Sequence, residues 1–180
     1  MASLSPVALK FVGVLDEPKN TLGRTEEVVE MVLDKPELIE DLYQCYFQPD
    51  EWVRLRVSSS FKRLWRADEQ LVEPYITGFV GQVSKIDQPS INWTFAQMCE
   101  ELDHLLTAPQ RATATKRMRG YLETSDDWIV QNCCIATLSK WATADESLAK
   151  WLAPKLEGLA RSERKSVAKR AAKAIELLAK

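Results

Sequence analysis

Side chains for catalysis and metal binding are scarce in this sequence. It has one histidine, His104, and four cysteines, of which only Cys133 and Cys134 are adjacent. The sequence shows neither a metal partner nor the other members of a catalytic triad around this histidine. No Gly-rich phosphate loop, His-Glu-x-x-His or Gly-x-Ser-x-Gly motif occurs. We therefore expect no enzyme activity, catalytic residue, metal or cofactor, with His104 at the surface or half-buried and Cys134 in the core.

Long hydrophobic runs are also absent. A membrane span needs about 20 mostly apolar residues, and the apolar stretch 76–83 is already interrupted by polar residues and glycines. Residues 1–15 lack the basic start of a secretory signal. Four cysteines are few for a disulfide framework, and thiols stay reduced inside cells. These observations predict a cytoplasmic protein with no membrane partner.

The chain does have enough apolar residues for one packed core. Of its 180 residues, 46% are hydrophobic and 28% are charged, and the formal net charge is −2. A domain of this length buries about 70% of the surface of its unfolded chain. The near-neutral total gives no indication of nucleic-acid binding. We predict a single domain over residues 1–180.

Hydrophobic residues recur with a period near 38. Val53, Ile91, Val130 and Val167 follow one another at steps of 38, 39 and 37 residues. From each of them, mostly apolar or small residues stand 4, 7, 8 and 11 places later, which is the spacing of one helix face. A period of this length is typical of helical hairpins that bury their apolar faces by stacking.

Each of these helices is followed by a second amphipathic segment. The segments cover roughly residues 69–85, 109–122 and 146–159, with an earlier pair at 24–33 and 36–47 and a last helix at 164–180. Asp34, Asp68 and Asp145 are placed to cap the helices that follow them. Only Val7–Leu15 has the character of an extended strand.

The first helices resemble those of HEAT repeats. Pro49-Asp50-Glu51-Trp52-Val53-Arg54, followed by Val57, Ser58, Ser60 and Phe61, is similar to the HEAT pattern, and Val167 with Ala171, Ala172 and Ala174 is similar again. Asn92 and Gln131 stand where the motif has arginine. The resemblance covers roughly residues 22–180. It implies an all-α fold, a right-handed α-α superhelix of about four hairpins plus a terminal capping helix, with the second helices on the concave side.

The resemblance and the period together divide the chain into six parts. These are an N-terminal cap over residues 1–21, repeats over about 22–48, 49–87, 88–125 and 126–162, and a C-terminal helix over 163–180.

Tryptophan is plentiful, with six residues. Trp52, Trp128 and Trp141 occupy recurrent helix positions, so we expect them in the core or between repeats. Trp93 and Trp151 can present their rings at the surface, where indoles favour partner binding.

Charge is unevenly distributed along the chain. Residues 16–51 carry eleven acidic and three basic side chains, a net charge of −8, whereas residues 161–180 carry seven basic and two acidic ones, a net charge of +5. Arg111, Lys116, Arg117 and Arg119 follow one another with no acid before Glu123. On the concave side these bases would suit an acidic peptide or a phosphate. The alternative is an ordinarily solvated helix.

These features favour a non-catalytic protein-interaction scaffold or adaptor that uses the concave face. The expected partner is a protein or an acidic peptide, and the oppositely charged ends allow a monomer or a weak, salt-sensitive self-association. The predicted contact residues are Arg111, Lys116, Arg117, Arg119, Trp151 and Lys155.

The alternative function is nucleic-acid binding. One HEAT-like family comprises DNA alkylation-repair glycosylases, whose sites use tryptophan, aspartate and arginine in a basic cleft. Trp141 and Asp145 resemble part of such a site. Asp145 also fits the cap position that recurs at Asp68.

Overall fold

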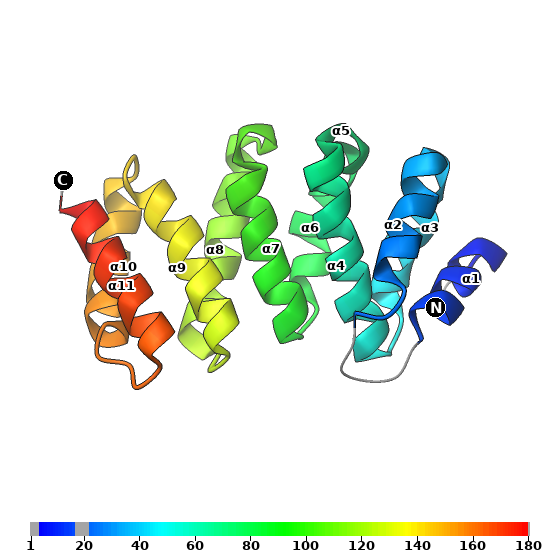
Figure 1. Cartoon of the computed structure of the whole chain (residues 1–180). Helices are drawn as coiled ribbons and strands as arrows, with labels where there is room; N and C mark the ends of the chain where they lie inside the picture. The colour runs from blue at the N-terminus through cyan, green and yellow to red at the C-terminus, as the bar shows by residue number, and fades with distance from the viewer. Residues whose placement is uncertain (1–3, 17–21, 180) are drawn as a thin grey trace. The chain divides into compact units, whose positions relative to one another are not determined.

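The computed structural model describes residues 4–16 and 22–179, whose regular elements are all helical (Figure 1). The predicted all-α class is therefore confirmed. Contacts divide the chain into two compact units, residues 1–83 and 84–180, which we describe separately as unit 1 and unit 2. Parts of the predicted N-terminal cap, residues 1–3 and 17–21, and the terminal Lys180 lie outside the described residues.

Unit 1 contains short and long helices around the central α4. Its α-helices are α1 (Pro6–Leu15), α2 (Thr25–Asp34), α3 (Ile39–Gln44), α4 (Glu51–Ala67), α5 (Glu69–Val72) and α6 (Ile76–Gly81). Asp50 begins α4, because its Oδ1 accepts hydrogen bonds from the backbone N–H groups of Trp52 and Val53 at 2.7 and 2.9 Å. Helix α4 contacts α1, α2 and α5.

Helix α1 corrects the prediction of an extended segment over Val7–Leu15. Ser5 Oγ accepts a hydrogen bond from the backbone N–H of Ala8 at 2.9 Å, and Pro6 occupies the first turn. A serine cap followed by proline is a strong helix start. Ala8, Phe11 and Leu15 are buried at helical spacing, so the helix buries one apolar face.

The segment predicted as one helix over residues 69–85 is broken. Pro74 lies between α5 and α6, in a 3₁₀ turn over Glu73–Tyr75. Proline has no N–H to donate, and its ring clashes with the preceding helical turn. The helix therefore stops and restarts at Ile76, and its second half faces the aromatic core of unit 1.

Two of the three predicted aspartate caps are confirmed. Asp68 accepts from Gln70 N at 3.0 Å, and Asp145 accepts from Leu148 N at 2.9 Å. The prediction of a helix cap at Asp34 is wrong, because Asp34 is the last residue of α2. Lys35 takes φ −135° and ψ 84° before Pro36, as residues before proline avoid the helical region.

Aromatic rings fill the core of unit 1. Tyr43, Tyr46, Phe61 and Phe79 are buried, and Tyr75 joins them at the edge. Phe61 and Phe79 meet edge to face with ring centroids 5.1 Å apart, and Tyr46 and Phe79 do so at 5.5 Å. Edge-to-face contacts of this kind add to the free energy of burial.

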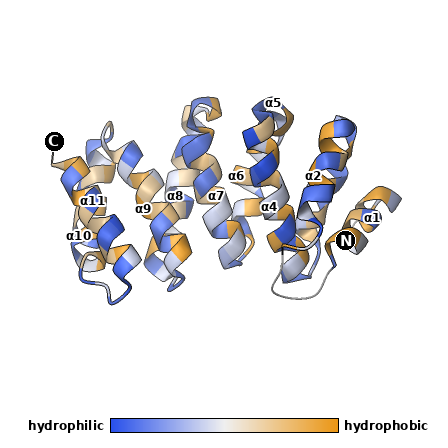
Figure 2. Cartoon of the chain, viewed as in Figure 1, coloured by the Kyte–Doolittle hydropathy of each residue, from blue (hydrophilic) through white to orange (hydrophobic). Residues whose placement is uncertain are grey.

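Unit 2 is built around α9. Its helices are α7 (Pro89–Glu101), α8 (Ala108–Thr124), α9 (Trp128–Ala142), α10 (Glu146–Leu159) and α11 (Lys165–Leu178). Helix α9 contacts each of the other four. Thr137 on α9 is fully buried, and its Oγ1 donates to the carbonyl oxygen of Ala96 on α7 at 2.9 Å. Polar and apolar residues mix along α11 (Figure 2). Val167, Ala171 and Ala174 of this helix are buried.

The tryptophan predictions are confirmed for Trp141 and wrong for Trp128. Trp141 is 4% exposed, whereas Trp128 is 44% exposed. Trp128 is the first residue of α9, directly after the Asp127 cap, and the buried face starts two residues later at Val130. Trp93 and Trp151 are half-buried, as is Trp52.

The cysteines and His104 lie where the sequence predicts. Cys134 is buried, as are Cys45 and Cys99, and Cys133 is half-buried. Burial raises the pKa of the Cys45 thiol to about 12 and that of Cys134 well above its ordinary value. Such thiols stay protonated and unreactive near neutral pH. His104 is exposed in a 3₁₀ turn.

Candidate functional site: the two flanks of helix α8

Helix α8 presents its basic residues on two different flanks. Thr107 begins the helix with a capping box, in which it exchanges hydrogen bonds with Gln110. Ala114, Met118 and Leu122 are buried and form the inner edge. Because side chains four residues apart share a face, Arg111 and Arg119 lie on one flank and Arg117 and Tyr121 on the other.

The first flank brings Arg119 together with two residues of α10. The guanidinium carbon of Arg119 lies 4.2 Å from the ring centroid of Trp151, and Lys155 Nζ lies 5.7 Å from the same centroid. A cation over an indole is attracted by the negative ring face. Lys155 also pairs with Glu123 at 3.3 Å. We call Arg119, Trp151 and Lys155 the Arg119–Trp151 face.

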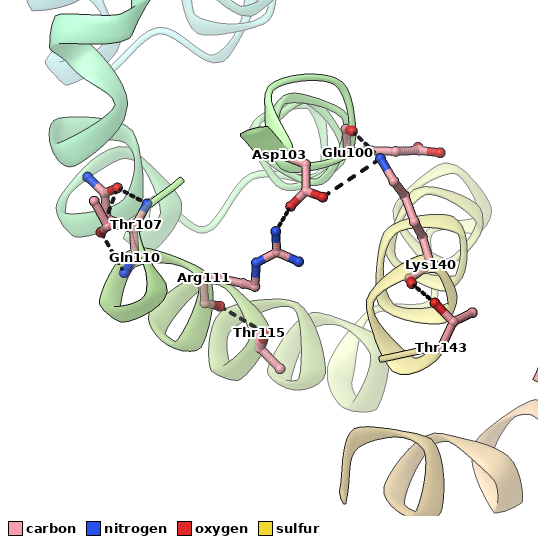
Figure 3. Close-up of polar contacts among 8 residues, drawn as sticks. All are labelled: Glu100, Asp103, Thr107, Gln110, Arg111, Thr115, Lys140 and Thr143. Atoms are coloured by element: carbon pink, nitrogen blue, oxygen red, sulfur yellow. Dashed lines mark hydrogen bonds and ion pairs between the residues drawn. The ribbon is translucent and has the colours of Figure 1, made fainter. Parts of the chain in front are cut away.

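Arg111 lies on the same flank but is held by its own neighbours. Its Nη2 lies 2.5 Å from Asp103 Oδ1, and its guanidinium carbon lies 5.0 Å from the ring centroid of Trp141. Lys140 approaches Asp103 Oδ2 at 3.9 Å and donates to the carbonyl oxygen of Glu100 at 3.1 Å (Figure 3). Arg111 is therefore a partly neutralised cation at the end of this flank.

The second flank of α8 borders a hollow of about 1130 Å³ within unit 2. Residues 84–87 form one wall and α8 forms the other, and Tyr121 Oη joins the walls by donating to the carbonyl oxygen of Ser84. Gly120, Ala112 and Thr113 leave the hollow open, because their side chains are small. We call this space the α8 hollow.

Lys116 and Arg117 line the α8 hollow rather than the Arg119–Trp151 face. Neither forms an ion pair with any residue that the structure describes. The six predicted contact residues are thus distributed over three places. Arg119, Trp151 and Lys155 meet, Arg111 sits with Asp103 and Trp141, and Lys116 and Arg117 border the α8 hollow.

Asn92 of the α8 hollow was not among the predicted contact residues. It is 6% exposed, and its Oδ1 has no hydrogen-bond partner within residues 4–16 and 22–179. A buried, unpaired amide oxygen costs about 1–3 kcal/mol. The sequence did mark this position, because Asn92 stands where the repeat motif has arginine.

Trp141 and Asp145 line a smaller depression of about 530 Å³ with Arg111. The Trp141 ring is 4% exposed, and Asp145 is engaged in capping α10. Arg111 is engaged with Asp103 at 2.5 Å. All three side chains therefore already serve the fold: Trp141 by its burial, Asp145 by capping α10 and Arg111 by pairing with Asp103.

Metal-binding clusters and membrane-spanning helices are absent from the described ranges 4–16 and 22–179. Within them, no three His, Cys, Asp or Glu side chains are placed to hold a metal ion. No helix of the same residues has the length and apolar character to cross a bilayer.

Comparison with known proteins gives one structural relative and no family. No protein-family model matches the chain. No curated protein matches it either. The crystal structure of an engineered protein is similar, with a TM-score of 0.61 and 17% sequence identity over 95% of this chain and 72% of the other. At this identity the likeness shows the fold alone. The chain is thus an all-helical protein compatible with a helical-repeat fold.

Proposed function

We propose that the protein is a non-catalytic interaction module that binds an acidic peptide segment of a partner through the Arg119–Trp151 face. The observation that carries this proposal is the stacking of Arg119 on Trp151 at 4.2 Å, with Lys155 on the same ring. Tryptophan and arginine are the residue types that contribute most at interfaces. A half-buried indole flanked by Arg119 and by Lys155, which also pairs with Glu123, offers both apolar area and charge to a carboxylate-rich chain.

The helical hairpins support a HEAT-like arrangement, which we propose as the finer architecture. The support is the period near 38 residues and the succession of paired helices within each unit. A right-handed α-α superhelix of this kind would put the Arg119–Trp151 face on an extended binding surface in the cytoplasm.

Site-specific photocrosslinking tests the proposed function. A photoreactive residue at position 155 should capture a partner peptide rich in Asp and Glu, identified by mass spectrometry. The same residue at position 150 is the control, because Lys150 on α10 is 75% exposed and pairs only with Glu146 among the described residues. Arg119→Glu should abolish capture at position 155, since it places a carboxylate opposite an acidic segment.

A second control distinguishes a local effect of the charge change at Arg119 from an effect of the net charge of the protein. Arg170→Glu makes the same charge change on the exposed surface of α11. It should leave capture at position 155 unchanged. If Arg170→Glu and Arg119→Glu weaken capture equally, or if the captured segment is not acidic, the Arg119–Trp151 face is not the binding site.

Nucleic-acid binding is the second candidate, favoured by one observation. Arg111, Trp141 and Asp145 line the same depression, as a DNA alkylation-repair glycosylase-like site would require. Against it stand the buried Trp141 ring and the presence of Glu146 in the same lining. Binding to a DNA duplex at low salt decides between the candidates, because phosphate attraction is strongest there. We expect none, and tight binding that Arg111→Ala weakens would favour the second candidate.

A further inference from the structure

The α8 hollow has the features of a second binding site, separate from the Arg119–Trp151 face. Its lining includes Asn92, whose amide oxygen is buried without a partner among the described residues, and the two cations Lys116 and Arg117, which make no ion pair among them. Its volume of about 1130 Å³ is sufficient for a small organic ligand. Buried polar groups without partners are rare in folded proteins and call for an explanation.

The charges around the hollow point to the kind of ligand. Its cations are Lys85, Lys116 and Arg117, and its carboxylates are Asp87, Asp126 and Asp127. The lining is therefore neutral overall, so a simple anion would be attracted only weakly. On the α8 wall the two signs are separated, because Lys116 and Arg117 lie in the helix and Asp126 and Asp127 follow its end, whereas Lys85 and Asp87 stand together on the other wall. A ligand with a negative and a positive end matches this order.

The backbone rise of α8 from Arg117 to the end of the helix gives an approximate length for the ligand. Arg117 precedes the last helical residue, Thr124, by seven positions, which is about 10 Å along a helix that rises 1.5 Å per residue. An extended tripeptide spans about 10 Å at 3.3–3.6 Å per residue. We infer that the α8 hollow binds a short zwitterionic peptide, with its terminal carboxylate on Arg117 and Lys116 and its terminal ammonium group at Asp126 and at Oδ2 of Asp127, whose Oδ1 caps α9.

Asn92 completes this site by its amide chemistry. An asparagine side chain offers one acceptor oxygen and two donor hydrogens, which are the groups that a peptide bond pairs with. Its terminal torsion is broad, so a rotation can turn the unpartnered oxygen toward a peptide N–H. The small side chains at Gly120 and Thr113 leave space for a backbone without large side-chain pockets.

Titration with three related tripeptides tests the inference. Triglycine carries both charges, N-acetyl-triglycine lacks the ammonium group, and triglycinamide lacks the carboxylate. Two-dimensional amide NMR of the full chain should show triglycine shifting the resonances of Gly120, Thr124 and the Asn92 side chain. Each blocked peptide should bind at least about tenfold more weakly, since it loses one ion pair. Equal binding of all three, or no shift at about 10 mM triglycine, overturns the inference.

Two variants and their matched controls locate the site. Gly120→Leu fills the hollow, and a Cβ at position 120 meets no atom within 4 Å, so the helix tolerates it. Gly158→Leu on α10 is the control, because a Cβ there is equally unobstructed. Arg117→Gln removes the proposed carboxylate partner, with Arg170→Gln on α11 as its control. Triglycine binding should be lost in the first member of each pair only. Shifts centred on the Trp151 indole would assign the peptide to the other flank and overturn the inference.

Discussion

Aromatic residues have different neighbours in the two units. In unit 1 the rings of Tyr43, Tyr46, Phe61 and Phe79 pack on one another in the interior. In unit 2 the rings of Trp141 and Trp151 face guanidinium groups of α8. The two cation-facing rings differ in exposure, because Trp141 is buried and Trp151 is half-buried. A cation neighbour therefore marks a candidate contact residue only where the ring is also accessible, as at Trp151.

The largest expected effect is the loss of a core ring in unit 1. Phe61 is fully buried and contacts the rings of Tyr46 and Phe79. Phe61→Ala should lower the free energy of unfolding by about 3–5 kcal/mol, since it leaves a cavity. Trp151→Ala, at a half-buried ring, should cost far less while abolishing capture at position 155. Urea unfolding followed by circular dichroism measures both, and equal losses would remove the distinction between the two kinds of ring.

A pair of glycines sharpens the same comparison. A Cβ at Gly78 in α6 would lie 2.2 Å from Tyr43 Oη, whereas a Cβ at Gly120 in α8 meets nothing within 4 Å. Tyr43 is confined by the aromatic core, so Gly78→Ala should destabilise by about 1–3 kcal/mol. Gly120→Ala should stabilise by up to about 1 kcal/mol, because alanine is the better helix former.

Thermal unfolding of the two alanine variants should therefore move in opposite directions. A stabilised Gly78→Ala variant would mean that Tyr43 moves away without loss, and that the aromatic core of unit 1 is less tightly packed than described.

A smaller loss of stability is expected in unit 2, where a polar contact joins two helices in place of ring packing. Thr137 Oγ1 lies 2.9 Å from the Ala96 carbonyl oxygen, across α7 and α9, and 3.1 Å from the Cys133 carbonyl oxygen, so its single hydroxyl hydrogen is shared between them. Thr137→Val keeps the volume but removes this donor, and should cost about 1 kcal/mol. Thr113→Val on exposed α8 is the control, since its bond to the Pro109 carbonyl oxygen is local and solvated. Chemical denaturation that ranks the two equally would contradict this role.

The smallest expected change in stability is that of unit 1 at alkaline pH. Burial raises the pKa of Cys45 and Tyr43 to about 12 each, and nearby carboxylates add to it. The unfolded chain therefore releases these protons at lower pH than the folded chain. The stabilisation of the folded state by the buried, protonated Cys45 is fully present below the unfolded pKa of about 8.5 for cysteine. It is lost as the pH rises toward 12. Stability should fall above about pH 9, and the fall should be shallower in Cys45→Val. Identical pH profiles for the two proteins would exclude Cys45 as a contributor.

The helical periodicity predicted the all-α class and most of the long helices, because burial of one face dictates where hydrophobic residues stand. It failed where local chemistry overrides periodicity. Pro74 ends a helix that the apolar pattern continues, and Ser5 and Pro6 start a helix in a segment whose composition suggested a strand. Trp128 occupies a repeat position but lies at the first helical residue, before the buried face begins.

The candidate site was only partly predictable. The sequence identifies the basic residues of α8, and their spacing already assigns Arg117 and Arg119 to different flanks. The sequence does not show how far α8 lies from residues 84–87. The α8 hollow and the unpartnered amide oxygen of Asn92 are therefore found only in the packed structure. Nor does the sequence show that Asp103, eight residues before Arg111, is the partner that neutralises it.

The Asp103 contacts have a consequence for how unit 2 opens. Asp103 follows the end of α7 and attracts Arg111 of α8 and Lys140 of α9, while Lys140 also binds the last turn of α7. The ends of α7, α8 and α9 therefore meet at Asp103. Fraying of any one of these ends separates at least one of the polar contacts made there. In hydrogen exchange, the amides at the C-terminal turn of α7 and the C-terminal turn of α9 should lose protection together, and both should exchange faster in Asp103→Asn.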